Sequence, residues 1–558
     1  MHAAIGSGVT PHAAAILRRW GRIWIGVVVA AMLGFTLVRL ATGGDRLQDW
    51  ESVVWPGALL ALALGGVMAL RFEGLGGAWL ALVAVVGGVA LAAHFGPVIG
   101  AIPVVAVIPA SVFFVLAWRR VRSPRAVFVY FVVLGVVLGA GGYTAYAAYD
   151  AVFGPSHPES ATSAPQPSPV QWMWSGAADT GGFTVVAAVD ATGPVMLRVA
   201  DELDDQWVQA ATATPDEHGI VRLVVAGLAP GSSYRYVIET SLGRGPEGST
   251  ATFPEGAADV TIAFSSCARR GSNGAVFDAI RSSTPDLYIV TGDLFYGDIG
   301  PDDPEAFRAA YDEALTQPAQ AALYRSVPIA YVWDDHDFSQ NDGDASAASR
   351  PAAMAVYRDN VPHYPLQGID APIFQAFTIG RVRVIITDTR SGRDPAGSML
   401  GGEQLAWLED ELSRSVGEFP LVLWVNPDPW IATPAPGADH WGGFPDERRR
   451  LAELIEQLRF PGFLMLSGDA HMLAIDNGSH NTYGGGGPGF PVFHAGALDR
   501  PGSLKGGPYS EGALPGGGQF GVIEVIDDGH DLQVRLTGRG WDGREVMTWS
   551  FTVPEGPA

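Results

Sequence analysis

The sequence predicts a multi-domain protein in which an α-helical membrane region precedes a β-sandwich and an α/β domain. Five long apolar segments near the N-terminus indicate the membrane region. Short runs of alternating apolar and polar residues, separated by turns, indicate the sandwich. From about residue 258 onward, strands alternate with helices, which indicates an α/β domain with a mostly buried sheet. At 558 residues the chain is long enough for several domains.

Each apolar segment approaches or exceeds the ~20 residues that cross a bilayer core. The segments are 23–41, 52–70, 75–93, 97–118 and 126–147. Arginines gather before the first segment and in two of the loops, which would all lie on one side of the membrane. The positive-inside rule then predicts a multi-pass plasma-membrane protein with a cytoplasmic N-terminus and an extracytoplasmic C-terminal part. Residues 1–148 are therefore expected to form a transmembrane region of about five helices in contact with the lipid bilayer.

A Pro-rich stretch and a set of short strands follow this region. Residues 149–169 contain several prolines among Ser, Thr and Ala, which predicts a semi-extended linker. Residues 170–256 contain runs typical of strands between Gly, Pro and Asp turns. The turn Gly227–Tyr236 resembles the one that leads into a strand of fibronectin type III sandwiches. We therefore expect a fibronectin III-like β-sandwich over 170–256.

The net charge of -23 is unevenly distributed along the chain. Residues 1–147 carry ten arginines and four acidic residues, so their net charge is about +6 and that of the remainder about -29. This negative charge on the part of the chain after residue 147 argues against nucleic-acid binding through a basic surface. Cys267 is the only cysteine and excludes an intrachain disulfide. Lys505 is the only lysine.

Polar residues follow six predicted strands of the α/β domain, 257–558, at the points where the strands end. They occur in Ser265–Cys267, Thr291–Tyr296, Trp333–Asp342, Asp388–Arg393, at Asn426 and in Ser467–His471. Open α/β sheets place ligands beyond the carboxyl ends of their strands, so these residues indicate a functional site at one edge. Within Trp333–Asp342, four carboxylates and an imidazole would repel or crowd one another unless a cation lies among them. Oxygen and imidazole donors suit a hard or borderline metal ion.

The order of these motifs carries a family resemblance. Ser-Cys, Gly-Asp-x-x-Tyr, Trp-Asp-Asp-His-Asp, Asp-Thr-Arg and Gly-Asp-x-His follow one another along the chain. They resemble the PhoD-like alkaline phosphatase branch of the calcineurin-like metallophosphoesterases, over about residues 170–550. The resemblance implies an αββα sandwich for the α/β domain. It also implies Fe³⁺ and Ca²⁺ as cofactors, with other divalent metals as alternatives.

The resemblance further implies roles for individual residues. It assigns metal ligation to Cys267, Asp293, Tyr296, Asp335, Asn341, Asp469 and His471. His336 would protonate the leaving group as general acid. Arg390 would belong to the catalytic set and Arg393 would bind substrate, because a guanidinium can hold phosphate oxygens through a bidentate fork.

These inferences predict a membrane-anchored, extracytoplasmic phosphoesterase of the alkaline phosphatase D type. It would hydrolyse phosphate esters by attack of a metal-bound hydroxide. A phosphodiesterase or phospholipase D that acts on a lipid or cell-wall polymer is an alternative, because it would use the same metals. A non-catalytic membrane adhesion or sensing protein is a third reading. Monoesters and diesters both remain open as substrates at this point.

Overall fold

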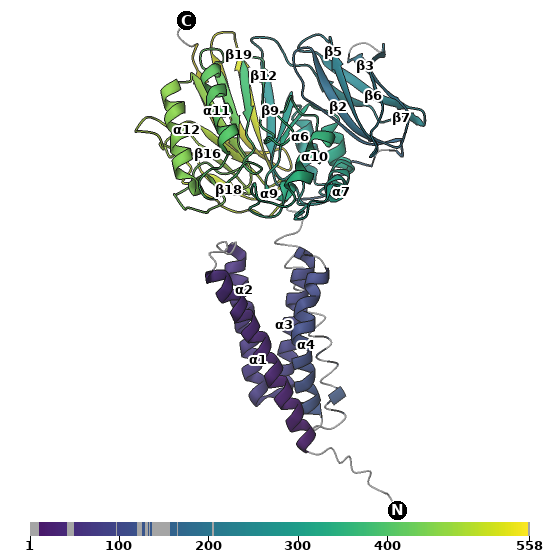
Figure 1. Cartoon of the computed structure of the whole chain (residues 1–558), viewed down its shortest axis with the longest axis vertical. Coiled ribbons are helices and arrows are strands. Elements are labelled where there is room, and N and C mark those ends of the chain that lie inside the picture. The colour runs from purple at the N-terminus through teal and green to yellow at the C-terminus, as the bar shows by residue number, and fades with distance from the viewer. Residues whose placement is uncertain are drawn as a thin grey trace, which may run out of the picture. The chain divides into compact units, whose positions relative to one another are not determined.

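The computed structural model describes residues 11–41, 49–95, 97–119, six positions between 125 and 136, 157–164, 166–202 and 206–555. The chain divides into two compact units, Met1–Gly154 and Pro155–Ala558 (Figure 1). The first unit is helical in its described part, and the second contains all of the described strands.

Within the first unit, the described helices pack through a small apolar core. Ile25 of α1, Leu62 of α2, Leu80 of α3 and Phe114 of α4 are buried in it. The helices are α1 (Pro11–Ala41), α2 (Asp49–Arg71), α3 (Glu73–Phe95) and α4 (Pro97–Arg119). These contacts make the four helices one packed bundle.

The predicted membrane region is wrong. Among the described residues, no helix is both long and apolar enough to cross a bilayer. Arg18, Arg19 and Arg22 lie inside α1.

This finding overturns the membrane part of the predicted fold class. It likewise overturns the multi-pass plasma-membrane placement, with its cytoplasmic N-terminus and extracytoplasmic catalytic domain. Most of the fifth apolar segment, 126–147, and part of the linker, 149–169, lie outside the described residues.

Three sheets form the second unit. A nine-stranded sheet has the order β21-β20-β19-β9-β10-β11-β1-β2-β5, and a seven-stranded sheet has the order β12-β13-β14-β15-β17-β16-β18. The third has the order β4-β3-β6-β7, with β8 paired to β6. The first strands are β1 (Val170–Gly176), β2 (Gly182–Val189), β3 (Val195–Asp201), β4 (Val208–Ala213), β5 (Ile220–Ala226), β6 (Ser233–Thr240), β7 (Gly243–Arg244), β8 (Gly248–Ala251), β9 (Val260–Ser265), β10 (Leu287–Thr291) and β11 (Ile329–Val332). The others are β12 (Gln375–Ile379), β13 (Val382–Ile386), β14 (Leu421–Val425), β15 (Gly462–Ser467), β16 (Met472–Asp476), β17 (Val492–Ala495), β18 (Ala513–Pro515), β19 (Gln519–Asp527), β20 (Leu532–Gly540) and β21 (Glu545–Val553).

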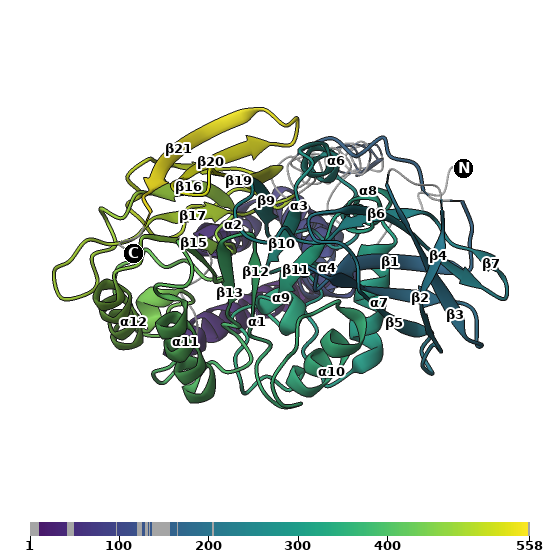
Figure 2. The ribbon, with the colours of Figure 1, turned by 90° about the horizontal axis from the view of Figure 1, so that it is seen from above.

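The nine- and seven-stranded sheets pack face to face, and helices cover their outer faces. The alternation along β14 shows why: Leu421 and Leu423 belong to the core between the sheets, whereas Val422 and Trp424 pack under α11 and α12. Both faces of the strand are thus buried, as its unbroken apolar sequence predicts. The helices are α6 (Ala275–Ser282), α7 (Pro304–Leu315), α8 (Pro318–Tyr324), α9 (Asp335–Phe338), α10 (Arg350–Asn360), α11 (Gly402–Ser415), the 3₁₀ helix η1 (Trp441–Gly443) and α12 (Pro445–Leu458). Figure 2 shows α11 and α12 beside β13 and β15, and α7 and α10 beside β1 and β5.

The β-sandwich expected from the sequence shares a sheet with the α/β part. Strands β1, β2 and β5 extend the nine-stranded sheet, because β1 pairs in parallel with β11 at Gly176 and Ile329. The sheet of β3, β4 and β6 forms the opposite layer, and Val185 and Leu197 share one core with the rest of the unit. The β-sandwich and the α/β domain of the predicted fold class are therefore consistent with the structure.

Candidate metal centre

The six polar motifs converge at the carboxyl ends of strands from two sheets. β9, β10 and β11 are parallel neighbours in the nine-stranded sheet, and β13, β14 and β15 are parallel neighbours in the seven-stranded sheet. The prediction of one sheet edge is therefore incomplete, because two sheets contribute to the site.

Backbone hydrogen bonds hold three of the motif loops together. The Cys267 N–H donates to Gly292 O at 3.3 Å, the Ala268 N–H to Asp293 O at 2.9 Å, and the Asp469 N–H to Ser266 Oγ at 3.2 Å. A Cβ on Gly292 would lie 2.5 Å from Asp334 Cβ, and one on Gly468 would lie 2.3 Å from Thr291 O. Both Gly-Asp motifs therefore need glycine so that the loops can approach one another.

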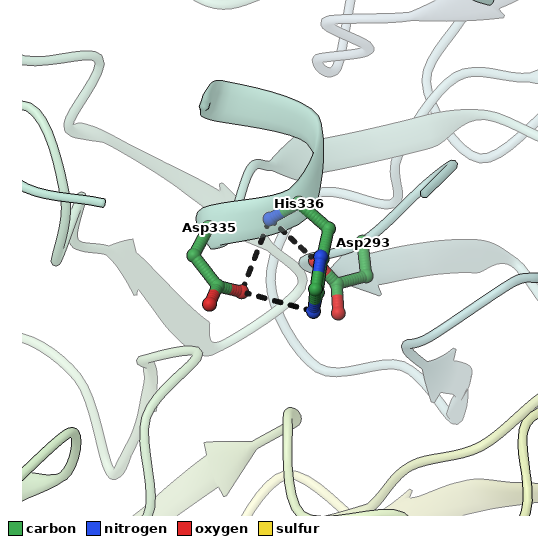
Figure 3. Close-up of side chains that lie close together, drawn as sticks. All are labelled: Asp293, Asp335 and His336. Atoms are coloured by element: carbon green, nitrogen blue, oxygen red, sulfur yellow. Dashed lines mark hydrogen bonds and ion pairs between the residues drawn. The ribbon is translucent and has the colours of Figure 1, made fainter. Parts of the chain in front are cut away.

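Asp293, Asp335 and His336 form the centre of the site (Figure 3). Each offers one potential ligand atom, and these atoms all lie within 4.8 Å of one another. Asp335 and His336 project from the one-turn helix α9, while Asp293 follows β10. The His336 backbone N–H lies 3.0 Å from Asp335 Oδ1 and 3.3 Å from Asp293 Oδ1, so it holds both carboxylates in place.

A second acidic group shares Asp335. Ligand atoms of Asp335, Asp342 and Asp439 also lie within 4.8 Å of one another. The Asp342 N–H donates to Asp335 Oδ2 at 2.7 Å. Burial and the nearby charges of Asp439 and Asp335 raise the pKa of Asp342 to about 8. Two neighbouring groups of potential metal ligands therefore share the carboxylate of Asp335.

The imidazole of His336 is held from several sides. Its Nδ1 lies 2.6 Å from Asp298 Oδ1, and its ring stacks on Tyr296 with a centroid distance of 4.0 Å. Burial opposes the charged ring, but the carboxylates of Asp335 and Asp293 and the Asp298 contact outweigh burial and raise the pKa of His336 to about 10. Nε2 is 4.0 Å from Asp335 Oδ1, so this atom faces the acidic centre.

The other predicted ligands border the same centre. The Tyr296 hydroxyl lies 2.9 Å from His471 Nε2. Burial raises the pKa of the Cys267 thiol well above its ordinary value, and the nearby Asp293 and Asp469 raise it further. Burial also raises the pKa of Asp469 to about 7, against the opposing charge of Lys505. These residues are therefore brought together as the sequence predicts, although their roles as ligands stay predictions.

The donor set fits a metal ion. Oδ2 of Asp293 and Oδ2 of Asp469 are buried and have no hydrogen-bond partner among the described residues. A buried carboxylate oxygen without a partner is costly, and a cation would compensate it. Cys267, Asp293, Asp469 and His471 also have backbone φ angles of 65°, 53°, 62° and 43°. Such left-handed conformations cost about 1–3 kcal/mol each and cluster at functional sites.

Arg390 and Arg393 bind carboxylates rather than facing open space. Arg390 is fully buried and pairs with Asp334, with Asp439 at 2.6 Å and with Asp428 at 3.3 Å. Arg393 donates to Asp428 at 2.7 Å, to Asp439 and to the Thr389 carbonyl at 2.7 Å. Carboxylates and a carbonyl oxygen thus occupy both guanidinium groups. This arrangement favours a positioning role, and phosphate binding by either arginine stays a prediction.

Asp337 stabilises the site through hydrogen bonds to the segments around it. Its carboxylate accepts hydrogen bonds from the Asp334 N–H at 2.7 Å, the Leu294 N–H at 2.8 Å and the Tyr331 hydroxyl at 2.7 Å. These three bonds tie α9 to the loop after β10 and to β11. Asp337 therefore orients the metal-capable residues, as an outer hydrogen-bonding partner does in metal sites.

Asn341 and Asn426 lie at the edge of the site. Asn341 is exposed beside Asp342, and its role stays a prediction. Asn426 is buried and bonds the Asp428 carbonyl and the Trp441 indole, which makes it part of the loop structure.

Sequence reasoning missed four residues that border the site, namely Asp439, Asp342, Arg500 and Lys505. Asp342 belongs to the acidic stretch itself, so its charge was a usable signal. Asp439, Arg500 and Lys505 lie in long connections without a recognisable motif. Lys505 Nζ contacts Asp469 Oδ1 at 2.6 Å, which only the folded chain brings about.

Comparisons with known proteins find a family model and a curated relative that match part of this chain. The PhoD-like phosphatase family model matches residues 262–502. Alkaline phosphatase D of Bacillus subtilis (strain 168) is 25% identical over 340 residues, which are 50% of this chain and 58% of that protein. The chain thus spans just over half the length of this curated relative.

Two solved structures share the fold. A structure of PhoD has a TM-score of 0.58 and 20% identity, over 70% of this chain and 92% of that chain. Purple acid phosphatase PPD1 from seeds of yellow lupin (Lupinus luteus) has a TM-score of 0.50 and 14% identity, over 69% of this chain and 74% of that chain. The two solved structures show that this chain shares their fold, and the match to the PhoD-like phosphatase model is confined to residues 262–502.

Proposed function

We propose that the protein is a metal-dependent phosphoesterase of the alkaline phosphatase D type. The observation that carries this proposal is the cluster of Asp293, Asp335 and His336, with metal-capable atoms within 4.8 Å of one another at the carboxyl ends of the strands. The buried, unpartnered oxygens of Asp293 and Asp469 call for a cation at the same place.

The donors divide by their chemistry. Cys267, Asp293, Tyr296 and His471 offer a thiol sulfur, a carboxylate, a phenol oxygen and an imidazole, a set that suits a transition metal such as Fe³⁺. Asp335, Asp342 and Asp439 offer only oxygen, a set that suits a hard cation such as Ca²⁺. A bound metal ion would act as a Lewis acid and offset the negative charge of the phosphate ester.

The chain's own residues supply the remaining chemistry. Asp298 fixes Nδ1 of His336, and Tyr296 fixes the plane of its ring, so that Nε2 faces the acidic centre. From there, His336 can give a proton to the oxygen of the departing alcohol. Arg390 forms an ion pair with Asp334, and Asp337 connects α9 to the loop after β10. The reaction is therefore hydrolysis of a phosphate ester.

The test uses the full-length protein purified with its metals. We expect iron and calcium by elemental analysis and hydrolysis of an aryl phosphate or a bis-aryl phosphate. Asp293→Asn should lose metal and activity together, because it removes one negative donor from the centre. The matched control is Asp446→Asn, an exposed carboxylate on α12, which should retain both. An Asp293→Asn protein with full activity would contradict the proposal.

A further inference from the structure

Arg500 differs from the other arginines at the site because no carboxylate among the described residues pairs with it. Its Nε is buried and has no hydrogen-bond partner in the described part of the chain. Arg390 and Arg393 pair with Asp428 and Asp439 in the same region. A half-buried cation with an unsatisfied donor is unfavourable unless an anion reaches it.

The neighbouring residues place Arg500 beside the reaction centre. Its guanidinium carbon lies 4.1 Å from the ring centroid of Tyr296. The same ring stacks on His336 and contributes the hydroxyl that contacts His471. Arg500 is also one of the charges that, after burial, lower the pKa of His471. The guanidinium and the His336 ring therefore lie on opposite faces of the Tyr296 ring, and the guanidinium is also near His471, a predicted metal ligand.

The backbone holds this position firmly. The Leu498 N–H donates to Ser266 O at 2.9 Å, and the Ser503 N–H donates to His471 O at 3.1 Å. Just before Arg500, the Asp499 carboxylate accepts from the Arg269 N–H at 2.6 Å and from the Ser272 hydroxyl at 2.5 Å. The segment is thus fastened on both sides of Arg500 to loops that carry predicted ligands.

A purely structural explanation accounts for part of this arrangement. A guanidinium over an aromatic ring is stabilised by the cation–π interaction. This contact satisfies none of the N–H donors, however, and leaves Nε buried without an acceptor. An oxyanion with several acceptor oxygens would satisfy the fork.

We propose that Arg500 binds the phosphate group of the substrate and holds two of its oxygen atoms through the guanidinium fork. The inference rests on the proposed function and deepens it. It assigns substrate recognition to a residue with unpaired donors, in place of Arg390 and Arg393, whose donors are already bound.

The test measures binding of inorganic phosphate to the full-length, metal-containing protein by isothermal titration calorimetry. Arg500→Gln should weaken binding at least about tenfold, as expected for loss of a hydrogen bond between charged groups. It should also raise KM for an aryl phosphate, with metal content and thermal unfolding unchanged. Arg535→Gln removes the same charge from an exposed site on β20 and should bind phosphate within about twofold of the wild type.

Arg500→Lys provides the second variant, because it keeps the charge and loses the fork. Its affinity for phosphate should lie between those of the wild type and Arg500→Gln. The inference is overturned if Arg500→Gln binds phosphate like the wild type, if the wild type does not bind it, or if Arg500→Gln does not fold and Arg500→Lys retains full affinity. If the wild type binds phosphate through Arg500 but hydrolyses no ester, the proposed function fails and this inference stands.

Discussion

Replacing Arg390 by methionine should destabilise the second unit strongly. The Arg390 side chain has no exposed surface, and neither have those of its partners Asp334 and Asp428. Asp439 is 16% exposed and also contacts Arg393, so it keeps a cationic partner in the variant. Asp334 loses its guanidinium partner and cannot turn to solvent.

The magnitude follows from this burial. Removing one member of a buried ion pair costs about 3–5 kcal/mol, because the other charge is left uncompensated. That is a large part of the ~5–15 kcal/mol that stabilises a typical protein. Arg390→Lys keeps the positive charge but lacks the guanidinium fork, which reaches several carboxylates at once. Its free energy of unfolding should therefore fall by less than that of Arg390→Met.

Denaturation by guanidinium chloride, followed by tryptophan fluorescence, measures the free energy of unfolding. The matched control is Arg449→Met, which breaks an exposed pair with Asp446 on α12 and should cost less than about 1 kcal/mol. The reasoning is refuted if Arg390→Met changes the free energy of unfolding by under about 1 kcal/mol while KM for an aryl phosphate rises tenfold. That result would indicate a direct contact between Arg390 and the phosphate of the substrate.

Two further predictions concern α9. His336→Ala should lower kcat by about 10²–10⁴, the usual contribution of a general acid, with bound metal nearly unchanged in elemental analysis. A parallel loss of metal would make His336 a ligand instead, since it belongs to the metal-capable cluster. Asp337→Ala should reduce the free energy of unfolding by at least about 2 kcal/mol, because three donors, including the Tyr331 hydroxyl, lose their acceptor. If denaturant titrations give Asp337→Ala the same free energy of unfolding as the wild type, water has replaced the carboxylate as the hydrogen-bond acceptor.

Local sequence was sufficient for most strands and for the motif residues. Val260–Phe264 and Leu421–Val425 are continuous apolar runs, and both are buried strands, β9 and β14. The polar residues that follow these strands lie at the carboxyl ends of the strands, where open α/β sheets bind their ligands. The prediction of a membrane region rested on apolar length alone, and in the described part of the chain no helix meets the requirement for crossing a bilayer.

The sequence by itself determined which residue types stand at the strand ends, and therefore the metal-capable chemistry of Cys267, Asp293, Asp335 and His336. Only the tertiary structure decided which arginine side chains are already paired with carboxylates. Arg390 and Arg393 look like phosphate ligands in the sequence, yet they pair with Asp428 and Asp439, which follow a different strand. Arg500 carries no motif and still reaches Tyr296. Charge pairing depends on distances between segments far apart in the chain, and those distances are set when the two sheets pack together.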